Sequence, residues 1–475
     1  MNRHLSSAAL TLALCLSANA WSQWSVDPQK NTPLANVAGA AQVQPQIAVR
    51  EDGHWWISWL ALHPQGTPPQ GYDVYLQRLG PDGREQFAHQ GVQVAKLGVG
   101  WTEDYGLAAD VPGNAVLTFQ DDRPNPPQRA ISASKIDSAG KLLWNAQTAH
   151  SGHAPHVSIL PEGQSFIGWS ADTENSVRLR KLDAQGRPVW HDDSGAPLDF
   201  LLAEPNFTYA LADLQATADG SVIVSFVRSR GFSGAKHLYA NKISPSGQLL
   251  WGSNHVKVFE GGSLQQGNFP RFVADGKGGA VFAWYSIDPK LQVFAQHVLA
   301  NGQLAFAANG VPVSTDVQQA RVSPAVSYQP ATGEITVLWT ELDNAMAQHR
   351  RGLYAQRISA SGARQWGETG RPLRPLALHD IGDLQSIAAD DGTLAFWIET
   401  NPGQPNSIQG IKLDAAGAPL CPQFVVSTRA TNKSRLASAS APSGQVLLVW
   451  EEQGQTQGSD IYLQGVRRDC KLGGQ

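Results

Sequence analysis

Three histidines recur at every third position of the segment AHSGHAPHV, at His150, His153 and His156, in a chain with only 13 histidines. Imidazole nitrogens at short spacing can bind a divalent metal such as zinc, with carboxylates completing the ligand set. Gly152 and Pro155 argue against a helix that would place these side chains on one face. Two interpretations stay open: a metal site, or a polar, hydrogen-bonded loop.

Carboxylates placed two residues after a tryptophan or phenylalanine form a second candidate set. Glu341, Glu399 and Glu452 hold this position in three successive segments near the C-terminus, and Asp121 holds it earlier in the chain. Neighbouring carboxylates can bind a cation or a basic partner, or act as the acid and base of a glycoside hydrolase. The alternative interpretation is a solvated acidic rim.

The chain lacks several short sequence motifs that are typical of enzymes. The sequence has no G-x-S-x-G nucleophile motif, no H-E-x-x-H zinc motif and no G-x-x-x-x-G-K-[ST] phosphate loop. A formal net charge of −4 gives no reason to expect nucleic acid as a partner. The sequence therefore leaves open whether any catalysis occurs.

The elements that must position these residues come from an internal repeat. A turn glycine is followed six residues later by Trp or Phe, with one copy a residue shorter, and alternating apolar residues lie between the two. This pattern predicts a strand that follows a tight turn. The pairs are Gly53/Trp59, Gly113/Phe119, Gly163/Trp169, Gly220/Phe226, Gly278/Trp284, Gly333/Trp339, Gly392/Trp397 and Gly444/Trp450.

A second motif follows each copy of the first, as in VRLRKLDAQGRPVW and LYANKISPSGQLLW, where an aromatic residue comes four positions after a turn glycine. Cys421 replaces this aromatic in the seventh copy, and the eighth copy ends before its last strand. The N-terminal segment QWSVDPQKNTPLANV supplies that strand, with Trp24 in the aromatic position. We therefore predict an all-β fold: an eight-bladed β-propeller of four-stranded blades, its ring closed by the N-terminal strand that completes the last blade.

The second motif resembles the tryptophan-docking repeat of quinoprotein-type eight-bladed propellers, as the pairs Gly140/Trp144 and Gly247/Trp251 illustrate. The resemblance covers nearly the whole chain after its N-terminal segment and implies the propeller fold. The turn is one residue shorter than in that family, and the sequence lacks the adjacent cysteine pair associated with quinone-binding enzymes. The resemblance therefore supports the fold and gives little support to a quinone cofactor, so a quinone- or metal-dependent oxidoreductase is only a third interpretation.

The N-terminal residues predict export. Residues 1–20 combine an early Arg, an apolar run and a small-x-small ending, which is typical of a bacterial signal peptide cleaved before Trp21. Residues 21–475 then form one propeller domain, periplasmic or secreted, without a membrane span. Cys421 and Cys470 fall at matching turns of neighbouring repeats, so we expect a disulfide between them.

Candidate ligand contacts gather where the innermost strands begin. His156 starts one such strand, and Gln46, Arg271 and Ala325 follow a proline at the matching position of other repeats, which predicts a mixed polar rim at the mouth of the channel. Trp101 lies in a variable loop with Tyr105 beside it, where an aromatic ring can stack on a sugar or receive a partner protein.

These features favour an exported, non-enzymatic scaffold that binds a protein or glycan through its loops. The alternative is a glycan-active hydrolase or lyase at the channel mouth, with His156, Asp121 or the three glutamates as acid and base. No cofactor is expected apart from a divalent metal on the three histidines, for which Asp172 and Glu174 are further potential ligands.

Overall fold

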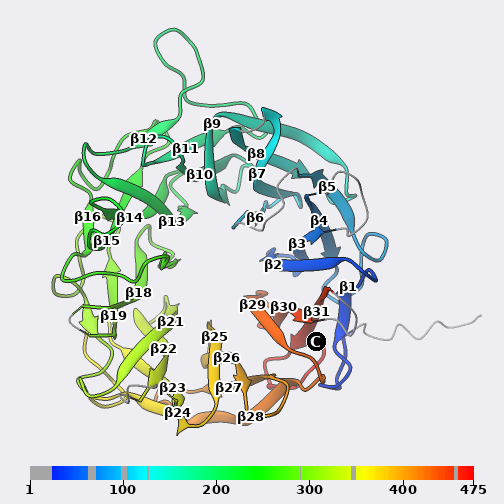
Figure 1. Cartoon of the computed structure of the whole chain (residues 1–475), viewed down its shortest axis with the longest axis vertical. Coiled ribbons are helices and arrows are strands. Elements are labelled where there is room, and N and C mark those ends of the chain that lie inside the picture. The colour runs from blue at the N-terminus through cyan, green and yellow to red at the C-terminus, as the bar shows by residue number, and fades with distance from the viewer. Residues whose placement is uncertain are drawn as a thin grey trace, which may run out of the picture.

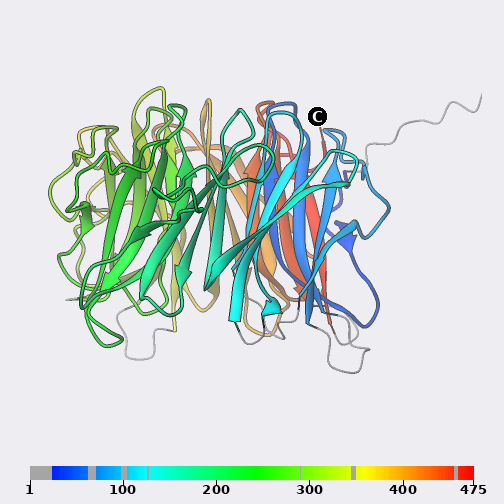
Figure 2. The same cartoon turned by 90° about the horizontal axis from the view of Figure 1, so that it is seen from above.

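The computed structural model describes residues 24–62, 71–97, 104–125, 128–288, 290–343, 349–453 and 458–474, and every element named within them is a β-strand. The strands form antiparallel sheets arranged in a ring (Figure 1). Figure 2 shows the strands running between the two faces of this ring. Within the same ranges, no helix has the length and apolar character needed to cross a membrane.

Six sheets have four strands each. The first holds β2 (Ala41–Val49), β3 (Trp55–Leu62), β4 (Tyr72–Leu79) and β5 (Val92–Lys96). The next two in chain order hold β13 (Thr208–Ala216), β14 (Val222–Ser229), β15 (Lys236–Ile243) and β16 (Val256–Phe259), then β17 (Phe272–Ala274), β18 (Ala280–Ser286), β19 (Gln292–Val298) and β20 (Val311–Pro312). They are followed by β21 (Ala320–Gln329), β22 (Glu334–Leu342), β23 (Arg351–Ile358) and β24 (Arg371–Ala377), then β25 (Asp380–Ala389), β26 (Gly392–Thr400), β27 (Ser407–Leu413) and β28 (Pro419–Ser427).

The sixth four-stranded sheet joins the two ends of the chain. It contains β29 (Lys433–Ser440), β30 (Val446–Gln453), β31 (Ser459–Val466) and the N-terminal strand β1 (Thr32–Ala35), in the order β1-β31-β30-β29. Thr32 pairs with Leu463 across the β1–β31 ladder. The predicted pairing of the N-terminal strand with the last repeat is therefore present.

The remaining sheet has seven strands because one long strand serves two repeats. Its order is β12-β11-β10-β9-β8-β7-β6, and β9 (Leu142–Ile159) pairs with β8 through its first part and with β10 through its last part. The other members are β6 (Gly106–Ala109), β7 (Ala115–Asn125), β8 (Gln128–Ile136), β10 (Ser165–Ala171), β11 (Ser176–Leu182) and β12 (Phe200–Leu202). This all-β ring of antiparallel sheets is consistent with the predicted β-propeller.

Tryptophans of the first motif lie in the cores between sheets. Trp59, Trp169, Trp284, Trp339 and Trp397 are each at most 1% exposed, as is Trp450 in β30. Each is the large side chain of a second strand whose two faces are covered by neighbouring sheets. The repeat glycine before each strand makes the tight turn, and the aromatic residue fills the interior.

Tryptophans of the second motif dock on the turn of the following repeat. The indole Nε1 of Trp144 donates to the carbonyl oxygen of Ala184 at 3.0 Å, and Trp251 donates to Ala300 at 2.9 Å. Trp24 reaches Pro81 in the same way at 3.4 Å, and a Cβ on Gly83 would lie only 2.5 Å from its ring. The turn glycine is thus required both by its positive φ and by the indole that covers it.

The predicted disulfide is confirmed. Cys421 lies in β28, and Cys470 lies in the turn after β31. The two residues are bonded, with their α-carbons 6.6 Å apart. The bond therefore links two neighbouring sheets across the region where the chain ends meet.

Candidate ligand-binding site

A bulge recurs in the innermost strands. Gln44, Ala154, Ser323, Asp383 and Arg435 have φ angles between 48° and 54°, a conformation that non-glycine residues rarely adopt. Each lies at a register shift between the first and second strands of its sheet. A bulge re-aims the side chains beside it, and repeated backbone strain of this kind is concentrated at functional sites.

In five repeats the residue two positions after the bulge, and in two others the residue at the equivalent position of the innermost strand, form a set that we call the inner ring. Gln46 lies opposite Ser58, His156 opposite Gly168, and Asp213 opposite Ser225, each just before the second-strand aromatic. Arg271 takes the equivalent place in the next repeat. The inner ring comprises Gln46, His156, Asp213, Arg271, Ala325, Gln385 and Ala437. Its charged and titratable members come from three consecutive repeats.

His156 and Asp213 form a hydrogen-bonded pair, with Nδ1 and Oδ1 3.3 Å apart. The Asp213 carboxylate also accepts the backbone N–H groups of Leu214 at 2.8 Å and Phe272 at 3.1 Å. Burial by itself would raise the pKa of Asp213, but the hydrogen bond and charge of His156 and the charge of Arg271 hold that pKa below its ordinary value. The ionised carboxylate orients the imidazole, and no described residue bonds its Nε2.

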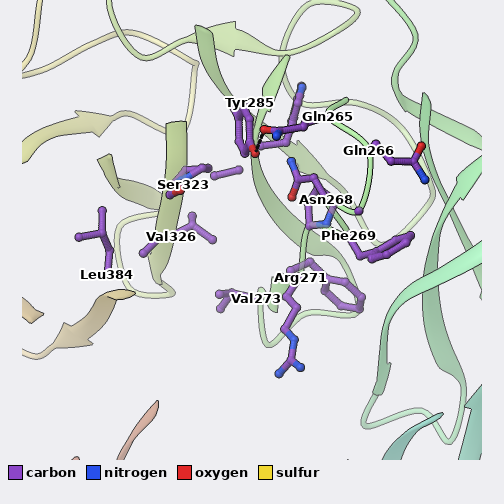
Figure 3. A pocket seen from close by; sticks show the side chains of 17 residues that line it. Gln265, Gln266, Asn268, Phe269, Arg271, Val273, Tyr285, Ser323, Val326 and Leu384 are labelled. Atoms are coloured by element: carbon purple, nitrogen blue, oxygen red, sulfur yellow. Dashed lines mark hydrogen bonds between the residues drawn. The ribbon is translucent and has the colours of Figure 1, made fainter. Parts of the chain in front are cut away.

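Two cavities flank Arg271. The first has a volume of about 550 Å³ and lies where β17 and β18 approach β21 (Figure 3). It is lined by Gln265, Gln266, Asn268, Phe269 and Tyr285, among others. The second has a volume of about 500 Å³ and is lined by Gln46, Asp104, Asp383, Gln385 and Arg435, together with Arg271. Arg271 therefore connects the two.

The first cavity offers both an apolar surface and unused polar atoms. The Phe269 side chain is 44% exposed. Tyr285 Oη donates to Gln265 Oε1 at 2.5 Å, which holds that amide at the wall of the cavity. Asn268 Nδ2 is buried and has no hydrogen-bond partner among the described residues. A buried donor without an acceptor is costly, and Asn268 Nδ2 is such a donor at the wall of this cavity.

The two loop aromatics predicted to contact a ligand have different outcomes. Trp101 lies outside the described residues. Tyr105 is only 4% exposed; its hydroxyl donates to the carbonyl oxygen of Gln44 at 2.8 Å and accepts from Ser58 Oγ at 3.1 Å. Burial raises the pKa of Tyr105 strongly. The prediction that Tyr105 lies in an exposed loop is therefore wrong. Tyr105 is buried, and its hydrogen bond to Gln44 stabilises the bulge at that residue.

The three glutamates predicted to form an acidic rim are buried instead. Glu341, Glu399 and Glu452 are 3%, 3% and 1% exposed. Each accepts a hydrogen bond from the indole of the tryptophan two residues before it, at 2.6, 3.0 and 2.9 Å, because alternate residues of a strand share a face. Each is also paired with an arginine, respectively Arg321, Arg374 and Arg429. In place of a solvated rim, the structure has three ion pairs with buried carboxylates, of which only Glu341–Arg321 is buried on both sides.

Replacing Glu341 with Ala should lower the free energy of unfolding by about 3 kcal/mol, because it leaves the Arg321 charge, 1% exposed, without its close partner. The matched control is Glu368→Ala, which removes a carboxylate that is 69% exposed and paired with Arg364. The control should change stability by less than about 1 kcal/mol. Urea denaturation measures both, and equal midpoints would contradict the buried pair.

The histidine trio does not converge on a metal in the part of the chain that the structure describes. His153 Nδ1 lies 2.7 Å from Asp172 Oδ1, and His156 is bonded to Asp213 instead. His150 is exposed, and Glu174 is paired with Arg178 at 2.7 Å. Among these residues no group of three His, Cys, Asp or Glu side chains is placed to hold an ion. The interpretation as a hydrogen-bonded segment fits this geometry better.

Asp121 is likewise interior. It is 1% exposed, and Ser132 Oγ donates to its Oδ2 at 3.2 Å. The structure thus separates the sequence-predicted residues into two groups. Gln46, His156 and Arg271 hold positions of the inner ring, and Gln46 and Arg271 line the second cavity together, whereas Asp121 and the three glutamates lie within the sheets.

Sequence inspection missed Asp213 and most of the first cavity. The triplets QPQ, APH, FPR and SPA mark four positions of the inner ring, but Asp213 follows Leu-Ala and lacks the proline signal. Phe269 is the first residue of the triplet FPR, and Asn268 directly precedes it. The same signal that marks Arg271 could therefore have identified both as candidate site residues. Tyr285 directly follows the repeat residue Trp284 but carries no motif of its own.

Comparisons with known proteins leave the family open. No family model matches the chain, and no curated protein matches it in sequence. Among solved structures, polysaccharide lyase Uly1 is 12% identical over 94% of both chains, with a TM-score of 0.45. Prolyl oligopeptidase B from Galerina marginata is 9% identical over 88% of this chain and 56% of that one, with a TM-score of 0.43.

A third similar structure, puromycin hydrolase, is 12% identical over 90% of this chain and 60% of that one, with a TM-score of 0.42. The expected resemblance to quinoprotein-type propellers is supported by the sheets themselves, and only at the level of an all-β ring of antiparallel sheets. Likenesses of this size assign no activity to the chain.

Proposed function

We propose that this chain is an exported propeller that binds a glycan through the two cavities beside Arg271. The observation that carries the proposal is the first cavity, where the exposed Phe269 ring lies near the unpaired amide of Asn268. Aromatic faces suit the apolar faces of sugar rings, and side-chain amides suit their hydroxyl groups. A concave site with few, well-placed polar groups is the usual form of a small-ligand site.

The proposal includes the finer architecture. We infer eight blades, with β9 serving both the second and the third and β1 completing the last, because this count matches the eight copies of each sequence motif. Export is supported by the signal-like residues 1–20 and by the Cys421–Cys470 bond, since disulfides persist in oxidising compartments.

A second candidate function is glycan cleavage by a hydrolase or lyase. It is favoured by the His156–Asp213 pair, in which a buried carboxylate orients an imidazole whose Nε2 has no partner among the described residues. An imidazole held in this way can take or give a proton during bond cleavage. Asp213 would then act as a positioning residue, because it reaches a ligand only through His156.

One experiment separates the two functions. The protein is applied to a glycan array, and the bound glycans are then incubated with it and examined for products by mass spectrometry. Retained glycan without product supports binding alone. Product that disappears in His156→Ala supports the second function, and absence of any retained or cleaved glycan would contradict both.

The Phe269→Ala variant tests the cavity directly. It should weaken binding of a retained glycan by about tenfold or more, as expected for an aromatic contact, while the melting temperature stays unchanged. The matched control is Phe232→Ala, since Phe232 is 83% exposed and lines neither cavity. Equal affinities of the two variants would place the ligand elsewhere.

A further inference from the structure

Arg271 is a guanidinium without an acceptor. Its side chain is exposed, and neither a hydrogen bond nor an ion pair joins it to any described residue. Other arginines near the inner ring differ: Arg435 lies 3.6 Å from Glu451, and Arg321 lies 2.9 Å from Glu341. Arg271 therefore keeps its five N–H donors for a group that the protein does not supply.

The backbone that carries Arg271 is fixed, although its head group is free. Pro270 restricts the chain on one side. On the other side, the N–H of Phe272 donates to Asp213 Oδ2 at 3.1 Å, and Gln215 Nε2 donates to the carbonyl oxygen of Phe272 at 2.6 Å. Figure 3 shows the Arg271 side chain extending away from Tyr285 and Gln265. The backbone at Arg271 therefore needs no reordering on binding, and the conformational cost is confined to its side chain.

The nearby carboxylates do not take the place of a ligand. Asp213 is occupied by His156 and by the backbone N–H groups described above, and it forms no ion pair with Arg271. Asp104 and Asp383 line the second cavity and also form no ion pair with Arg271. Asp104, Asp383 and the ionised Asp213 would all repel an anion, whereas the described lining of the first cavity contains no carboxylate, so a negative group is best placed where Arg271 borders that cavity.

We propose that the bound glycan is acidic and that Arg271 binds its carboxylate through two parallel N–H···O bonds. The inference rests on the proposed glycan-binding function and specifies its ligand class. A planar carboxylate matches the fork of a guanidinium, whereas the amides of Gln265, Gln266 and Asn268 are suited to the hydroxyl groups of the same sugars. The ligand class is therefore oligosaccharides that contain uronic acids.

Calorimetric titration with oligogalacturonate and oligoglucuronate, each beside its carboxyl-reduced counterpart, tests this assignment. The wild-type protein should bind at least one acidic form about tenfold or more tightly than the neutral form. Arg271→Gln should remove that preference, so that the acidic form binds no more tightly than the neutral form, and Arg271→Lys should retain part of it. Arg371→Gln, an exposed position at the start of β24 outside both cavities, should behave as wild type.

The outcomes separate the two proposals. Equal binding of acidic and neutral forms would overturn the carboxylate assignment and leave the glycan-binding function standing. Binding of neither form would overturn both. Preference for a sulfated neutral oligosaccharide over the uronates would replace carboxylate by sulfate, and tighter binding of an oligoglutamate peptide would overturn the glycan class.

Discussion

A chain that lacks residues 21–37 should aggregate, because it exposes the hydrogen-bonding edge of β31 that β1 covers. The same deletion removes Trp24 from its place over Gly83 and removes Asn31, whose Nδ2 donates to the carbonyl oxygen of Val426 at 2.9 Å. Size-exclusion chromatography should show loss of the monomer peak. A monomeric product with an unchanged melting temperature would show that the N-terminal strand contributes nothing to the ring.

A point substitution separates strand pairing from indole docking at this junction. Trp24 is 4% exposed, so Trp24→Ala should lower the free energy of unfolding by about 3 kcal/mol or more while β1 can still pair. Val26→Ala is the matched control two residues away, because Val26 is 76% exposed and should tolerate the change. Similar effects of the two variants would assign the stabilisation to the backbone of β1 alone.

Replacing both Cys421 and Cys470 with Ser should lower the free energy of unfolding by about 4 kcal/mol. The estimate follows from the loop-closure entropy of a 49-residue separation, which the bond removes from the unfolded chain. The measurement is the urea midpoint of the wild-type protein with and without reductant, compared with that of the double variant. The reduced wild type should unfold at the urea concentration of the double variant, and an unshifted midpoint in both would contradict a stabilising bond.

The parts of the fold that could be predicted are those with strong local signals. Turn glycines and strand aromatics repeat at fixed spacing, so the second strands, the docking tryptophans and the place of β1 followed from the sequence. The Cys421–Cys470 bond followed because the repeats place both residues at matching heights. In each case a few adjacent residues carry the information.

The candidate site depends on partners that the local sequence does not name. From the sequence alone, Glu341 is expected to be a surface carboxylate. In the structure it is paired within the sheet with Arg321, twenty residues away. From the sequence alone, Tyr105 is expected to be an exposed loop aromatic. In the structure its hydroxyl donates to the carbonyl oxygen of Gln44, 61 residues away. The bulges decide which side chains reach the inner ring, and a proline marks only some of them. Asp213 was missed for this reason.

The long strand β9 changes how the molecule would come apart. In most of the ring, neighbouring repeats meet through side chains, and each contact can be lost without breaking a backbone ladder. Along Leu142–Ile159 one continuous strand carries the backbone pairing from one repeat to the next, with bulges in both of its ladders. The second and third repeats therefore form a single cooperative block in mechanical terms. The sequence is duplicated one repeat at a time, but the second and third repeats would separate from the ring together.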